Sequence, residues 1–440
     1  MNSDEHADTD GSVPVSEPSQ AEAESLTEAL APAASGERIG SLDFIRGIAV
    51  MGILAANIIV FGQPFVAYVD PSTFLVDNGD PDGWMWLTQF TLIDGKMRGL
   101  FSVLFGAGLY LFMERAWERG ASRWLQARRL GWLGLFGLIH FYFIWKGDIL
   151  FLYSVCGLAS LMFIRMKPTN QMVLGMIGYV FGALAYSALF VSLYAFTSME
   201  VNDDADLAAM QTEMGSAVDE LLAEGAVETA LKQSGDYAGF VANNFSEHGT
   251  MPLELVVQVF IETIPLMLIG MALYRMGFFS GGFARRKMVL WGWAGLVGGG
   301  LVSLGIGLWT QSTGMDFFAT NLSMLGTSVL PRLAMVLGFA ALLAVYSPGW
   351  TGWLGQRVSA AGRAAFTNYL GTSILMLFVF HGWALGLFGS LNRPQLYLVT
   401  VLAWVTMLAW SKPWLDRYRY GPLEWLWRCL TYGKVFPLRR

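Results

Sequence analysis

The chain has few of the residues that carry charge, metal binding or redox chemistry. Of its 440 residues only 14% are charged, four are histidines, and Cys156 and Cys429 are the two cysteines. Two isolated cysteines suggest neither a disulfide framework nor a metal knuckle, so no metal and no tightly bound cofactor are expected. The acidic residues gather in soluble stretches of a chain with net charge −6, and nucleic acid is not expected as a partner.

Apolar residues, by contrast, make up 54% of the chain, and Gly and Trp are both abundant. This composition suits the hydrocarbon of a lipid bilayer better than a soluble core. A bilayer core of roughly 30 Å needs about 20 mostly apolar helical residues. The sequence therefore predicts an all-α, polytopic integral membrane bundle of about ten transmembrane helices, near 42–63, 88–113, 130–146, 149–165, 171–197, 252–275, 288–311, 322–346, 364–387 and 395–411.

The segments between these runs alternate in basic content. Residues 114–129 contain five arginines, whereas 64–83 contains no Lys or Arg and 198–251 is rich in acids. By the positive-inside rule the basic loops and the basic tail 412–440 are cytoplasmic, and both ends of the chain are expected there. Residues 1–36 lack Lys, Arg and any apolar run, which predicts a disordered acidic tail.

The bundle is thus expected as two halves of five helices, 37–197 and 252–411, joined by an acidic, partly helical extracytoplasmic loop at 198–251. Two interpretations of that loop stay open. It forms a cap over an outward cavity, or it is a solvated connection.

Ionisable groups inside a bilayer are costly and need a partner, a wet cavity or a function. On the first helix Asp43, Arg46 and Asn57 fall on one stripe that faces the bundle. An Asp43–Arg46 pair near the cytoplasmic interface is the alternative to a ligand site.

The second helix carries Asp94, Lys96 and Arg98 inside its crossing. Asp94 and Arg98 have the spacing of an intrahelical pair, which leaves Lys96 without a partner and available to an anion. Glycines further along the same helix, Gly99, Gly106 and Gly108, favour close helix packing.

His140 ends the third helix, and a short Lys-Gly turn separates it from Asp148 at the start of the fourth. We expect the two side chains to meet. A histidine oriented by a carboxylate is the usual form of a general base, although a buried histidine that only bonds a neighbour is the alternative.

Three more polar groups lie in later helices: Glu262 before Pro265, Arg332 after Pro331, and His381. Proline frees backbone carbonyls, and irregular backbone inside a membrane is tolerated where it lines protein or a wet cavity. Glu262 and Arg332 are therefore either ligand contacts or an ion pair that joins two helices.

Three stretches carry a family resemblance: RIGSLDFIRGIAVMGILAAN at 38–57, HFYFIWKGDIL at 140–150, and GRAAFTNYL at 362–370 continuing to YGPLEWLWRCLTYGK at 420–434. Together they resemble the YeiB family of bacterial inner-membrane proteins, whose C-terminal half is a domain of unknown function. The first helices of that family are similar to those of transmembrane acyltransferases such as heparan-α-glucosaminide N-acetyltransferase, through DFIRG at 43–47 and Asn57. Those enzymes place a histidine close after the first helix, whereas 58–83 contains none, so His140 would take its place.

The resemblance implies an acyltransferase that moves an acyl group from cytoplasmic acyl-CoA, as co-substrate, to an unknown acceptor at the outer side. In this hypothesis Arg46, Lys96 and Arg98 attract the CoA phosphates, with Asp43 and Asp94 beside them in the substrate site. Asn57 holds the thioester oxygen, and His140, oriented by Asp148, deprotonates the acceptor. The alternatives are a small-molecule transporter, with Glu262 or Asp94 carrying protons, and a non-catalytic scaffold. Against transport, the two halves show no inverted repeat in hydropathy. The sequence does not specify the acyl group, the solute or the oligomeric state.

Overall fold

The computed structural model describes residues 40–201 and 204–440, so the predicted acidic tail at 1–36 lies outside the described residues. Sixteen α-helices and five short 3-10 or π turns make up this part of the chain. The first half contains α2 (Gly40–Gly62), α3 (Trp84–Leu92), α4 (Lys96–Trp117), α5 (Arg123–Phe143), α6 (Leu150–Ser160) and α7 (Pro168–Ser198). The second half contains α10 (Met251–Arg275), α11 (Arg285–Ser312), α12 (Phe317–Asn321), α13 (Val329–Tyr346), α14 (Trp353–Arg363), α15 (Ala365–Phe380), α16 (Arg393–Arg417) and α17 (Pro422–Tyr432).

All ten predicted segments are helical, which confirms a polytopic helical membrane bundle, but fewer of them qualify as crossings. Within the described residues, seven segments are long and apolar enough to span a membrane, with α3 and α4 counted together as one of them. The pair α14–α15, bent by 86°, makes an eighth if it is one span. The two that do not qualify are α5, whose first turns carry Arg123, Arg128 and Arg129, and the short α6, which ends with η3 (Leu161–Phe163).

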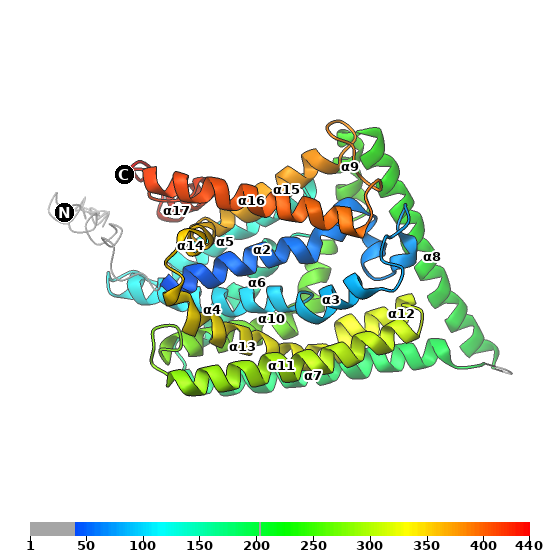
Figure 1. The fold of residues 1–440 in the computed structure, drawn as a ribbon, viewed down its shortest axis with the longest axis horizontal. Helices are drawn as coiled ribbons and strands as arrows, with labels where there is room; N and C mark the ends of the chain where they lie inside the picture. The colour runs from blue at the N-terminus through cyan, green and yellow to red at the C-terminus, as the bar shows by residue number, and fades with distance from the viewer. Residues whose placement is uncertain (1–39, 202–203) are drawn as a thin grey trace, which may run out of the picture.

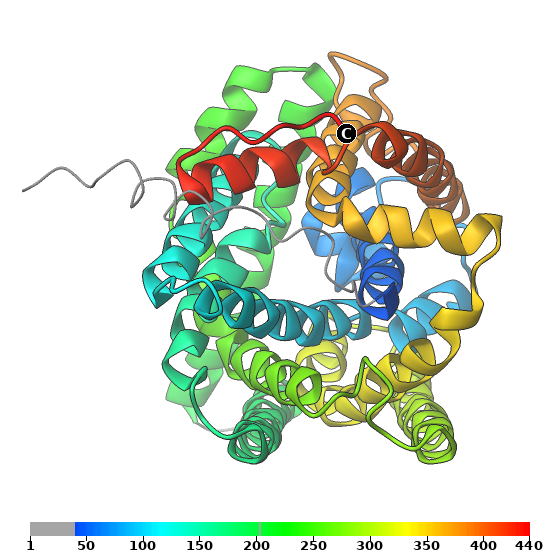
Figure 2. The ribbon, with the colours of Figure 1, turned by 90° about the vertical axis from the view of Figure 1, so that its left-hand side faces the viewer.

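The bundle has a basic end and an opposite end. The start of α2 and the C-terminus lie together at the left of Figure 1, where α14 and α17 run across the bundle (Figure 2). We call this the basic end because the arginine-rich loop 114–129 lies there. The opposite end is crossed by α8 (Ala205–Ser234), followed by α9 (Tyr237–Ser246). We call it the α8 end.

The interior lies around α2, α4 and α10, whereas α7 and α11 stand at the periphery (Figure 2). Glycine allows α4 and α10 to touch backbone to backbone. A Cβ on Gly106 would lie 2.0 Å from the Met267 carbonyl oxygen, and one on Gly270 would lie 1.9 Å from that of Val103. Gly108 faces open space instead, so the predicted packing role fails for that glycine.

The second predicted helix is in fact two. Its chain breaks between α3 and α4, where Gly95 adopts a left-handed conformation with φ of 72°. The Arg332 guanidinium lies where a Gly95 side chain would be, with 2.4 Å between an added Cβ and Nε. The glycine thus permits both the turn and the close approach of α13.

Candidate functional site

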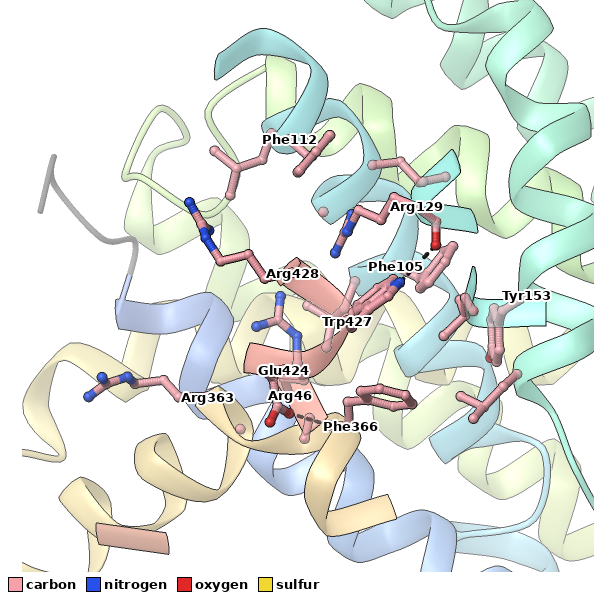
Figure 3. A pocket seen from close by; sticks show the side chains of 18 of the residues that line it. Arg46, Phe105, Phe112, Arg129, Tyr153, Arg363, Phe366, Glu424, Trp427 and Arg428 are labelled. Atoms are coloured by element: carbon pink, nitrogen blue, oxygen red, sulfur yellow. Dashed lines mark hydrogen bonds between the residues drawn. The ribbon is translucent and has the colours of Figure 1, made fainter. Parts of the chain in front are cut away.

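A cavity of about 390 Å³ lies at the basic end, between α2, α4, α5, α15 and α17. Its polar lining is mostly arginine, and Figure 3 shows several of these side chains around Trp427 and Glu424. The six lining arginines are Arg46, Arg115, Arg119, Arg129, Arg363 and Arg428. Of these six, Arg46 was a candidate site residue from the sequence. It forms an ion pair with Asp43 at 3.1 Å, which was the alternative to a ligand site.

Aromatic rings hold two of these arginines in place. The Arg129 guanidinium carbon lies 4.1 Å from the ring centroid of Trp427 and 4.6 Å from that of Phe112. Arg428 lies near the rings of Tyr420, Tyr432 and Phe436. Guanidinium groups ordered in this way suit phosphate, which arginine binds through paired hydrogen bonds.

Glu424 is the carboxylate in the described lining of this cavity, and it is already engaged. It accepts hydrogen bonds from the backbone N–H groups of Phe366 and Thr367 and from the Thr367 hydroxyl, which ties α17 to the start of α15. Burial raises the pKa of Glu424, and the hydrogen bonds from Thr367 oppose that rise. The described lining, with six arginines and this one carboxylate, therefore carries more positive than negative formal charge.

The inner part of this cavity is apolar. Phe101, Leu104, Phe105, Leu109 and Leu133 line it. At its inner end stand Ile149, Tyr153 and Tyr369. The Tyr153 hydroxyl is held by the Ser102 hydroxyl at 2.8 Å and the Arg98 carbonyl oxygen at 3.1 Å.

His140 and Asp148 meet beside this inner end, as their spacing predicts. The distance between His140 Nδ1 and Asp148 Oδ1 is 2.8 Å, and both side chains are buried. The second Asp148 oxygen accepts the N–H of Phe151 and so begins α6. The Tyr369 ring packs against His140 with centroids 5.3 Å apart. Among the described residues none bonds His140 Nε2, which leaves that nitrogen free.

A second cavity of about 450 Å³ lies at the α8 end. Ile149, the residue after Asp148, lines both cavities. A small void of about 10 Å³ shares one lining residue with each cavity. Tyr369 lines both the void and the basic-end cavity, and Asn57 lines both the void and the α8-end cavity. No residue in the described part of the chain hydrogen-bonds the Asn57 amide. His140 itself lines neither cavity.

The structure does not bring Arg46 together with Asp94, Lys96 and Arg98, the residues that the CoA hypothesis grouped with it. Asp94 and Arg98 line the α8-end cavity, the opposite end from Arg46. Nor do Asp94 and Arg98 pair with each other, because the break at Gly95 interrupts the helical spacing. Asp94 accepts a hydrogen bond from Gln89 at 3.1 Å instead. Lys96 donates a hydrogen bond to the Phe90 carbonyl oxygen at 2.5 Å.

Glu262 and Arg332 form the ion pair that the sequence allowed, and Arg98 joins it. Arg332 NH1 lies 3.0 and 3.1 Å from the two Glu262 oxygens, and Arg98 bonds the same carboxylate. Tyr179 donates a further hydrogen bond at 3.3 Å. The three charges join α4, α10 and α13 on one side of the α8-end cavity.

The acidic loop contributes a cap over that cavity. Leu221, Glu224, Gly225 and Glu228 of α8 form part of its lining. Glu228 is buried between Lys146, at 2.9 Å, and Lys232, at 2.6 Å. Burial alone would raise the pKa of Glu228, but the two lysines lower it to about 2. Sequence reasoning missed Glu228 because an acid in a charged loop is usually solvated; its i,i+4 spacing to Lys232 was the available signal.

His381 does not belong to either cavity. It caps the C-terminus of α15 and packs against the Phe240 ring, with centroids 4.9 Å apart. Burial, together with the nearby Lys232, lowers its pKa to about 4. A neutral, buried histidine of this kind has a packing role.

These features define a polytopic helical membrane protein with a cavity at each end of its bundle. Residues 273–434 match the family described as "Protein of unknown function (DUF418)". The chain is 31% identical over 410 residues to uncharacterized protein YeiB of Escherichia coli (strain K12), covering 91% of this chain and 98% of the relative. Uncharacterized protein YxaH of Bacillus subtilis (strain 168) is 29% identical over 422 residues, 93% of this chain and 98% of the relative. The chain belongs to the YeiB family, as its motifs predicted, and no solved structure matches it.

Proposed function

We propose that the protein is an acyltransferase of the bacterial inner membrane. It takes an acyl group from cytoplasmic acyl-CoA at the basic end and delivers it to a hydroxyl or amine at the α8 end. The observation that carries this proposal is the position of Ile149. This residue lines the cavities of both ends, and its neighbour Asp148 holds His140.

The basic-end cavity supports CoA as the donor. Its arginines are opposite in charge to the phosphates of CoA, and a guanidinium group donates paired hydrogen bonds to phosphate. Its apolar inner part suits the pantetheine arm, which would bring the thioester to Tyr369 and Ile149. The positive-inside rule places this end in the cytoplasm, where acyl-CoA is found.

His140 acts as the general base in this mechanism. Its Nε2 takes the proton of the acceptor as the acceptor oxygen or nitrogen attacks the thioester carbonyl, and Asp148 stabilises the imidazolium. The Asn57 amide donates to the oxyanion. When the carbon–sulfur bond breaks, His140 returns the proton to the CoA thiolate. Tyr369 covers His140, so donor binding must displace its side chain.

Transport is the second candidate, and the chain of voids favours it. Tyr369 and Asn57 each line the small void and one of the two cavities, so a solute could pass by the same residues. Glu262 is a poor proton carrier for this purpose, because two arginines and Tyr179 already hold its carboxylate.

Calorimetric titration of the protein in nanodiscs with CoA and acetyl-CoA tests the donor site. The informative variant is Arg46→Gln/Arg115→Gln, and Arg417→Gln is the matched control, since Arg417 is exposed at the same end outside the cavity. A hydrogen bond to a charged group contributes about 1.5–3 kcal/mol. We expect saturable binding that weakens by roughly tenfold or more in the double variant and is unchanged in the control. Absence of CoA binding to folded wild type would reject the acyltransferase and favour transport.

A further inference from the structure

Two buried carboxylates at the α8 end are each flanked by two cations. Glu262 contacts Arg98 and Arg332, and Glu228 contacts Lys146 and Lys232. Each cluster therefore contains two cations and one carboxylate, which gives it a net formal charge of +1. Three of these cations, Arg98, Arg332 and Lys146, line the same cavity.

The remaining charges of the cavity do not remove this excess. Asp94 and Lys96 are both buried and have opposite formal charges, so the two together add no net charge. Glu224 on α8 is exposed to solvent. A buried charge without a counter-ion costs several kcal/mol, because its hydration is lost without an equivalent attraction in return. With the exposed Glu224 counted as well, the cations around this cavity still outnumber the carboxylates, which indicates that a negative charge enters it.

Two cations also have hydrogen-bond donors to spare. Arg332 is 5% exposed, and its Nε has no partner among the described residues. Lys146 is 8% exposed and bonds Glu228, although an ammonium group has three N–H donors. Much of the remaining wall is apolar, including Leu152 and Val259. An apolar pocket with a few convergent polar groups is typical of a small-molecule site.

We infer that the α8-end cavity binds an organic anion, a carboxylate or phosphate on an apolar body, between Lys146 and Arg332. If the proposed function holds, this anion is the acyl acceptor. Only this identification as the acyl acceptor rests on the proposed function. Binding of the anion itself does not require acyl-CoA. A free metabolite and a lipid headgroup share this chemistry.

The test is calorimetric titration of the full chain in phosphatidylcholine nanodiscs with hexyl phosphate, and with hexanol as the uncharged probe. Lys146→Met removes one donor and leaves Glu228 paired with Lys232, so the cap keeps an ion pair. We expect hexyl phosphate, but not hexanol, to bind wild type, and to bind Lys146→Met tenfold or more weakly. Lys146→Arg should restore the affinity.

Hexyl phosphate could also occupy the arginine cavity, so the basic-end variant Arg46→Gln/Arg115→Gln is the second control and should keep its affinity. The inference would be overturned if hexyl phosphate binding were lost in this variant but kept in Lys146→Met. It would also be overturned if wild type bound hexyl phosphate no more tightly than hexanol. Binding that disappears in phosphatidylglycerol nanodiscs would identify a lipid headgroup as the anion. Loss of CoA binding with hexyl phosphate binding intact would reject the proposed function and keep this site.

Discussion

His140 and Asp148 are joined by a 2.8 Å contact between Nδ1 and Oδ1 where α5 ends and α6 is about to begin. The contact fixes which imidazole nitrogen carries the proton, because the carboxylate accepts from Nδ1. Nε2 is then the nitrogen that can take a proton. His140 can therefore act as the general base of the proposed acyl transfer.

Asp148→Asn should separate the chemical step from donor binding. The amide keeps the size of the side chain and an oxygen for the Phe151 N–H, but it cannot stabilise an imidazolium. We expect turnover to fall by roughly 10²–10⁴-fold, with CoA affinity unchanged. Turnover is measured as CoA thiol released from acetyl-CoA in the presence of a cell-envelope extract. Unchanged thiol release would show that Asp148 only caps α6.

Gly106→Ala should destabilise the bundle, whereas Gly108→Ala should not. The added Cβ at position 106 would lie 2.0 Å from the Met267 carbonyl oxygen, so α4 and α10 must separate, while position 108 has nothing within 4 Å. We expect a loss of about 1–3 kcal/mol for the first variant. Thermal unfolding followed by tryptophan fluorescence in matched nanodiscs measures both. Equal melting temperatures would argue against the close contact.

Glu262→Gln should be among the most destabilising single changes. It leaves Arg98 and Arg332 buried without their shared carboxylate, and breaking a buried pair costs about 3–5 kcal/mol. Asp416→Asn is the control, because its partner Lys412 and Asp416 itself lie in solvent. A Glu262→Gln protein as stable as wild type would mean that this ion cluster does not hold the helices together.

Sequence alone could predict the helices, the family and the His140–Asp148 contact. The apolar runs are long enough to cross a bilayer as helices, and the short Lys-Gly turn lets the chain fold back so that His140 and Asp148 meet. The sequence could not show that Gly95 starts a new helix, because glycine is also common within membrane helices. That one break moved Arg98 away from Asp94 and onto Glu262.

The arginine cavity was also beyond sequence reasoning. Arg46, Arg129 and Arg428 come from α2, α5 and α17, and each alone satisfies the positive-inside rule without any site. Their convergence depends on how α17 folds back across the basic end (Figure 2). The sequence likewise could not show the environment of Glu228, because its partner Lys146 lies in a turn far away along the chain.

The cap should lose stability in acid through Glu228. Its pKa falls from 4.5 to about 2 on folding, since the attraction of Lys146 and Lys232 outweighs burial. A depressed carboxyl pKa stabilises the fold above pH 4.5, and this contribution disappears as the pH falls through about 2. The difference corresponds to about 3 kcal/mol.

Wild type and Glu228→Gln should therefore differ most in melting temperature near pH 7, and the gap should narrow between pH 4.5 and pH 3. Both proteins are compared at each pH, which removes the effect of acid on other groups. A gap that stays constant over this range would contradict the role of the Glu228 charge.

The most direct measurement of the central claim is acyl transfer by wild type and His140→Gln in nanodiscs. Each protein is given acetyl-CoA with an isotopically labelled acetyl group and a cell-envelope extract, and mass spectrometry detects any labelled product. We expect a labelled product with wild type and none with His140→Gln, although both bind CoA equally. Equal labelling by the two proteins, or no labelled product from a wild type that binds CoA, would contradict the account.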